Sequence, residues 1–134
     1  MNPGLFDLRD WRWPNFTPEE IRCSHCSELV LDPEAMDKLQ RAREEFRRPV
    51  RVASGYRCPL HPIEKAKPAP GPHTSGAAFD VYPHDMTLFN QWFQALAHQG
   101  LFRFGFSPGI FTLHTGRFHV DWDRSRQPAV WYYA

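Results

Sequence analysis

The chain is short of cysteine, of net charge and of long apolar runs, and each shortage excludes a class of protein. Its three cysteines are too few for the disulfide framework of a small secreted domain. Sixteen basic and fifteen acidic residues leave a formal net charge of +1, which gives no electrostatic reason to bind DNA, RNA or anionic lipid. No apolar run approaches the length that spans a bilayer, so we expect no membrane insertion.

The N-terminal stretch MNPGLFDLRDW also lacks the basic start and the apolar core of a signal peptide. We therefore expect a protein that is made in the cytoplasm. The length of 134 residues suits one domain over residues 1–134, and 42% hydrophobic residues are enough to fold it without disulfides.

Helix signals dominate the first half of the sequence and strand signals the last third. Asp32 followed by proline predicts a helix over 32–46, and the spacing of apolar residues is helical again from 87 to 99. A short helix is predicted at Thr17, and strands are predicted at 50–54, 77–82, 101–107, 110–114 and 117–122. This order predicts a single α+β domain with N-terminal helices packed on a small, mostly antiparallel sheet.

The stretch HTSGAAFD, residues 73–80, places an acid in a hydrophobic strand. Because side chains alternate along a strand, Asp80 points to one face while Phe79 and Val81 point to the other. The small residues at 75–76 predict a bend that turns His73 back towards Asp80. A carboxylate in this position needs a partner, and a metal ion is one candidate.

A second histidine belongs to the strand RFHVDW, in which His119 and Asp121 share a face. We interpret His73, Asp80 and His119 as three metal ligands. Two histidines and one carboxylate suit a catalytic zinc, which keeps its fourth position for water. Iron in a facial triad uses the same ligand types, so ligand identity alone leaves the metal open.

Three motifs in the order SGYRCP, HTSGAAFD and FHVDW resemble the zinc D-Ala-D-Ala carboxypeptidases and endopeptidases that cut peptidoglycan stem peptides. The vancomycin-resistance dipeptidases and the hedgehog signalling domain share the fold of this family. The resemblance covers about residues 13–131 and is strongest to the small members from phages and prophages. It implies a zinc metallopeptidase with His73, Asp80 and His119 as metal ligands.

The same resemblance assigns Arg57 to substrate binding and to charge stabilisation at the zinc. Ser54 and Tyr56, in the same SGYR motif, are its expected companions in binding substrate. A guanidinium group suits this role because it is always charged and binds carboxylates as a fork. The alternative is that Arg57 forms a structural salt bridge with Tyr56 packed beside it.

Two positions depart from the family pattern. Gly71 stands where many members have a serine, two residues before the first histidine ligand. The stretch HTGRF before His119 lacks the acid that serves as general base in many members. Asp121 is the nearest acid, and we expect it to act as the base or to orient a metal ligand. His114 is the second candidate for a catalytic role.

The pair Cys23 and Cys26 raises the question of a second zinc site. A structural site needs four ligands, and the sequence offers Cys58 and His25 to complete it without placing either of them. We expect buried thiols instead, or a disulfide if the protein reaches the periplasm.

The sequence therefore favours a zinc peptidase that acts on peptidoglycan peptides. The alternative is a metal-containing module without catalysis, which binds the cell wall or forms part of a virion. Either protein would reach the wall after release from the cell or on a virion, with a phage tail or lysis assembly as the possible partner.

Overall fold

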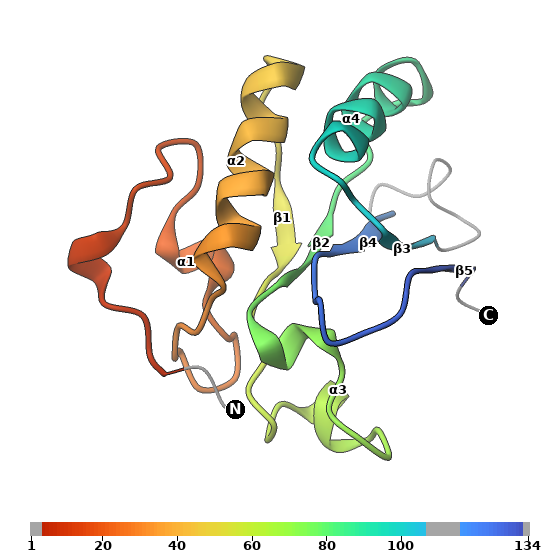
Figure 1. The fold of residues 1–134 in the computed structure, drawn as a ribbon. Coiled ribbons are helices and arrows are strands. Elements are labelled where there is room, and N and C mark those ends of the chain that lie inside the picture. Colours follow the sequence, from red (N-terminus) through yellow and green to blue (C-terminus); the bar gives the residue numbers. More distant parts are fainter. Residues whose placement is uncertain (1–3, 107–115, 133–134) are drawn as a thin grey trace.

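The structure is a computed structural model that describes residues 4–106 and 116–132, and it confirms an α+β fold (Figure 1). In these residues five strands form one sheet in the order β1-β2-β4-β3-β5. The strands are β1 (Val52–Ser54), β2 (Ala78–Val81), β3 (Arg103–Phe106), β4 (Phe118–Asp121) and β5 (Ala129–Tyr132). The helices are α1 (Pro18–Ile21), α2 (Pro33–Phe46), α3 (Pro62–Lys65) and α4 (Met86–His98), with 3-10 turns η1 (Leu8–Asp10) and η2 (Pro72–Ser75).

The two long helices begin at capping residues, of which the sequence analysis identified Asp32. The Asp32 carboxylate accepts a hydrogen bond from the backbone N–H of Glu34 at 2.9 Å and starts α2. Asp85 accepts from the backbone N–H of Leu88 at 2.9 Å, so α4 starts one residue before the predicted position. Both caps satisfy backbone donors that the first turn of a helix leaves unpaired.

The core lies between one face of the sheet and the pair α2 and α4, which pack against each other (Figure 1). Phe79 and Val81 of β2 and Phe118 and Val120 of β4 contribute the sheet side of this core, and all four are buried. Trp92 of α4 is fully buried on the helix side. The predicted alternation along both strands is therefore confirmed.

The pairing of β2 with β4 decides what lies on the other face of the sheet. The strands are antiparallel, with Phe79 opposite Val120 and Asp80 opposite His119. Residues that face each other across two strands also share a face of the sheet. The polar pair therefore lies on the face turned away from the core.

One strand was absent from the sequence-based prediction. β5 pairs in parallel with β3, whereas the other three pairings of the described sheet are antiparallel. Its side chains alternate between half-buried and exposed. Because all four residues of AVWY are apolar, the sequence shows no alternation that would predict a strand. The strand predicted at 110–114 lies outside the described residues. None of the helices in the described ranges is long and apolar enough to cross a membrane.

Gly76 connects η2 to β2 in a left-handed conformation, with φ at 78°. A Cβ atom at this position would lie 2.5 Å from the Leu31 Cα atom and 2.9 Å from the Val30 carbonyl oxygen. We expect Gly76→Ala to lose about 2–5 kcal/mol of unfolding free energy, from backbone strain together with overpacking. Denaturant unfolding of the purified variant measures this loss.

The matched control is Gly100→Ala, because Gly100 has φ at 72° and open space around its Cβ position. This variant carries the backbone strain alone, which amounts to about 1–2 kcal/mol. Equal losses in the two variants would contradict the close approach of Leu31 to Gly76.

Candidate metal centre

The structure brings together the side chains of His73, Asp80 and His119. His73 comes from η2, Asp80 from β2 and His119 from β4. The Asp80 Oδ1 atom lies 3.3 Å from His73 Nε2 and 3.2 Å from His119 Nδ1. One potential ligand atom from each residue lies within 4.8 Å of the other two. Three donors of the types that zinc prefers therefore converge on one point.

Both histidines are held through the ring nitrogen that faces away from Asp80. His73 Nδ1 lies 2.6 Å from the carbonyl oxygen of Gly55, which can only accept, so Nδ1 carries the proton. His119 Nε2 lies 2.6 Å from Asp121 Oδ2. Metal-binding histidines commonly donate their second N–H to a carbonyl or a carboxylate in this way. The remaining nitrogens of the two rings are left to face the same point as Asp80.

The carboxylate at the centre of the cluster is held in its ionised form. Burial alone would raise the pKa of Asp80, but its hydrogen bonds with His119 and His73 outweigh this and hold the pKa far below the usual range. Burial lowers the pKa of His73. Burial also acts to lower the pKa of His119, yet the bonds to Asp121 and Asp80 raise it overall. The cluster thus holds a charged carboxylate between two nearly inaccessible rings.

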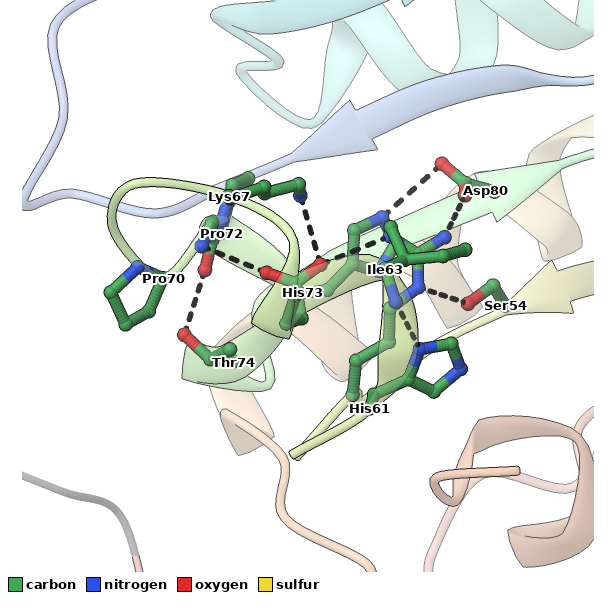
Figure 2. Close-up of polar contacts among 12 residues, drawn as sticks. Ser54, His61, Ile63, Lys67, Pro70, Pro72, His73, Thr74 and Asp80 are labelled. Carbon is green, nitrogen blue, oxygen red and sulfur yellow. Dashed lines mark hydrogen bonds and ion pairs between the residues drawn. The ribbon is translucent and has the colours of Figure 1, made fainter. Parts of the chain in front are cut away.

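Arg57 fixes the second oxygen of the Asp80 carboxylate. Its Nη2 donates to Asp80 Oδ2 at 2.9 Å, its Nε donates to Ser54 Oγ at 3.1 Å and its Nη1 donates to Glu64 Oε2 at 3.3 Å. In Figure 2, dashed lines mark the hydrogen bonds that Ser54 and Asp80 accept. With 9% of its surface exposed, Arg57 lines the cleft and at the same time orients a candidate ligand.

Glu64 is a buried acid that the sequence interpretation missed. Its side chain is completely buried and accepts from the backbone N–H of Gly71 and from Lys67 Nζ, both at 2.8 Å. Burial would raise its pKa, but Lys67, Gly71 and Arg57 together lower it. Glu64 therefore ties α3 to the segment that leads into His73.

This contact leaves little room for a side chain at position 71. A Cβ atom there would lie 2.7 Å from Lys67 Nζ and 3.0 Å from Glu64 Oε1. A serine at this position would therefore have to displace the end of the Lys67 side chain from its ion pair with Glu64.

A cleft of about 270 Å³ opens over the three candidate ligands. Its lining is formed by Arg57, Ile63, Lys67, Pro72, His73, Asp80, Arg103, His119 and Trp131. The Trp131 ring centroid lies 5.1 Å from that of His119, and the Arg103 guanidinium lies 5.2 Å from the Trp131 ring. The lining holds three cations, and each is paired with a carboxylate: Arg57 with Asp80 and Glu64, Lys67 with Glu64, and Arg103 with Asp121.

Asp121 lies behind His119, away from the cleft. It is fully buried, and its two oxygens accept from Arg103 Nε at 2.9 and 3.1 Å. Oδ1 also accepts from the backbone N–H of Asp123 at 3.1 Å. Of the two roles left open by the sequence, this geometry favours orientation of His119 over proton transfer to substrate. His114 lies outside the described residues, so its catalytic role stays a prediction.

Ser54 and Tyr56 do not line the cleft, although the sequence interpretation gave both a part in binding substrate. Ser54 Oγ accepts from Arg57 instead and thereby positions its guanidinium group. Tyr56 is 7% exposed and packs with Cys23, Val30 and Cys58. Residues 55–58 follow the end of β1 and form no regular strand. The direction of each side chain there cannot be read from the sequence, and Tyr56 packs in the cluster with the two buried cysteines.

Five further lining residues went unrecognised in the sequence: Ile63, Lys67, Pro72, Arg103 and Trp131. Lys67 lies in the proline-rich loop between the motifs, where the only available signal was the unusual loop composition. Arg103 lies on β3, which pairs with β4, and Trp131 lies on β5, which pairs with β3. Their contribution depends on strand order, which one sequence does not reveal.

Comparison with known proteins agrees with this geometry. A search of curated proteins found no match to the chain. A comparison with protein-family models matched Peptidase M15 over residues 14–121, a range that contains the three candidate ligands and Asp121. Because the match covers most of the chain and includes the whole cluster, the chain belongs to the Peptidase M15 family.

Proposed function

We propose that this protein is a zinc peptidase that hydrolyses amide bonds in peptidoglycan stem peptides or cross-links, of the D-Ala-D-Ala or L-Ala-D-Glu type. Membership of the Peptidase M15 family supports the coarser statement that it is a metallopeptidase. The observation that carries the proposal is the convergence of His73, Asp80 and His119 at the base of a cleft. The peptide class rests on the resemblance of the three motifs.

The donor set fits zinc. His73 Nε2, His119 Nδ1 and one Asp80 oxygen would hold the ion, and three protein ligands leave one position open. When bound, zinc polarises a carbonyl and lowers the pKa of water from about 15.7 to about 7. Gly55, Asp121 and Arg57 would each hold one ligand in position through the hydrogen bonds described above.

The cations of the cleft would bind the carboxylates of a stem peptide. Lys67 has 37% of its side chain exposed, against 11% for Arg57 and 12% for Arg103, and is therefore the most accessible of the three. Each of the three cations is already paired with a carboxylate, which cancels much of its positive potential. A direct bond from the accessible Lys67 ammonium group would therefore contribute most. Trp131 supplies an apolar surface for the peptide next to His119.

A second candidate function is a metal-containing module that binds cell-wall peptides without cleaving them. Asp80 is the one acid among the described residues that line the cleft, so no separate carboxylate base is present in that set. Under either function the protein would act on the wall after release or as part of a virion, with a phage tail or lysis assembly as partner.

Cleavage of defined peptidoglycan peptides by the purified protein separates the two candidates. The peptidase predicts new amine and carboxyl ends in mass spectra, loss of cleavage with a chelator and recovery after zinc is added back. Binding without any cleavage, in the presence of zinc, would contradict the enzyme and support the binding module.

His73→Ala removes one of three ligands, and we expect it to lower the zinc content by one equivalent per chain and to abolish hydrolysis. Elemental analysis of protein dialysed against zinc-free buffer checks this outcome. His98→Ala is the control, because His98 is exposed and bonds only to Glu45 among the contacts observed. Unchanged zinc content in the His73 variant would refute the site.

Asp121→Asn tests the role of the acid behind His119. The amide preserves the shape but loses the charge that holds the His119 N–H, so we expect zinc affinity to fall by about ten- to a hundred-fold. Competition with a coloured chelator measures the affinity. If Asp121 were the base instead, the variant would keep zinc and lose about a hundred- to ten-thousand-fold in rate.

The matched control is Asp123→Asn, the same change two residues further along the chain. The Asp123 carboxylate bonds to Ser125 and Arg126 and has no observed bond to His119. Equal loss of zinc affinity in both variants would show that the effect of Asp121→Asn is not specific to His119.

A further inference from the structure

Three thiols converge at a second place in the molecule. Cys23 and Cys26 lie in the turn that follows α1, and Cys58 lies in the segment that follows β1. Their sulfur atoms lie within 4.8 Å of one another, and all three cysteines are free. Cys23 and Cys58 are buried, whereas Cys26 is exposed. The sequence interpretation, which left Cys58 unplaced, missed this convergence.

Two backbone N–H groups point at the Cys23 sulfur atom. Cys23 Sγ accepts from the N–H of His25 at 3.4 Å and from the N–H of Cys58 at 3.3 Å. Hydrogen bonds of this kind favour the thiolate form, which is the form that binds metal. A disulfide would use two of the three sulfur atoms and leave the third unused beside them.

The group within 4.8 Å consists of the three thiols, and the sequence spacing offers His61 as the candidate fourth ligand. Cys23 and Cys26 are separated by two residues, and so are Cys58 and His61, and this spacing is usual for zinc ligands. His61 Nε2 lies 3.2 Å from the hydroxyl of Ser24, which is between the first two cysteines. The ring of His61 therefore lies next to the turn that carries both thiols (Figure 2 labels this ring).

We propose that Cys23, Cys26, Cys58 and His61 form a second zinc site whose role is structural. Thiolate and imidazole ligands select zinc over the hard cations magnesium and calcium. His61 Nδ1 now accepts a hydrogen bond from the backbone N–H of Ile63 at 3.2 Å. Coordination through Nε2 would move the ring proton to Nδ1 and break this hydrogen bond. The zinc–nitrogen bond replaces that contact and the one to Ser24.

This site would stabilise the segment that orients the candidate metal centre. Cys58 directly follows Arg57, whose side chain holds Asp80. Gly55, three residues before Cys58, supplies the carbonyl that holds His73. A metal that links Cys58 to the turn at Cys23 would therefore fix the position of both contacts. The proposal does not depend on the peptidase function, because a non-catalytic module would need the same support.

Cobalt substitution tests the site in the whole protein, purified under reducing conditions. Thiolate bound to Co²⁺ gives charge-transfer absorption in the near ultraviolet, which the histidine and aspartate ligands of the first centre cannot produce. We expect this absorption in the wild type, together with two equivalents of zinc per chain in the native protein. A variant carrying both His73→Ala and His119→Ala should keep one zinc and the full absorption.

Variants in the turn then assign the ligands. Cys26→Ser changes an exposed position, and we expect it to weaken the absorption and to lower zinc affinity at least tenfold. His61→Ala should lower the affinity while keeping the thiolate absorption. His25→Ala is the matched control, because His25 lies between the two cysteines in the same turn. This variant should leave the zinc affinity and the thiolate absorption unchanged.

Wild-type protein that binds a single zinc and shows no thiolate absorption with cobalt would overturn the proposal without any variant. A mass two units below that of the reduced chain would overturn it in favour of a disulfide. Loss of affinity in His25→Ala but not in His61→Ala would overturn the assignment of His61. Failure of peptide hydrolysis alone, with two zinc ions bound, would concern only the proposed peptidase function.

Discussion

The candidate metal centre depends on one pairing between two strands, in which Asp80 of β2 lies opposite His119 of β4. The neighbouring pair, Phe79 and Val120, is buried in the core and fixes the register. A shift by one residue would turn every side chain of β2 to the other face, placing Asp80 in the core and Phe79 in the cleft. The hydrophobic core thus specifies the position of the two ligands as firmly as it specifies the fold.

Residues 55–58 connect this sheet to the rest of the site. The Gly55 carbonyl holds His73, Arg57 holds Asp80, and Cys58 contacts Cys23. A Cβ atom at Gly55 would lie 2.6 Å from the Ile21 carbonyl oxygen, so the segment passes close to the end of α1. Its position is therefore set by backbone contacts on one side and by charged side chains on the other. Rigid support of this kind is what a metal site needs to keep its ligand geometry.

The sequence was most informative where a local pattern determines the structure. Asp32 with its proline predicted the start of α2, and alternation placed Asp80 and His119 on faces away from the core, as observed. The motifs predicted membership of a zinc peptidase family, which the match to Peptidase M15 confirms. These inferences need only neighbours along the chain or a recognisable residue order.

The sequence was least informative where distant segments meet. Glu64 is buried by contacts with Gly71 and Arg57, and Trp131 reaches the cleft only because β5 pairs with β3. Tyr56 belongs to the same short motif as Arg57, yet it packs in a different cluster. Such placements follow from strand order and loop paths, which depend on tertiary packing and not on local pattern.

The central claim is that His73, Asp80 and His119 hold one metal ion. An anomalous difference map, recorded at the zinc absorption edge from crystals grown with zinc, tests it most directly. The account predicts a peak bonded to His73 Nε2, His119 Nδ1 and an Asp80 oxygen, with Arg57 still bound to the other oxygen of that carboxylate. A map without a peak among these three side chains, at zinc concentrations that saturate the protein, would contradict it.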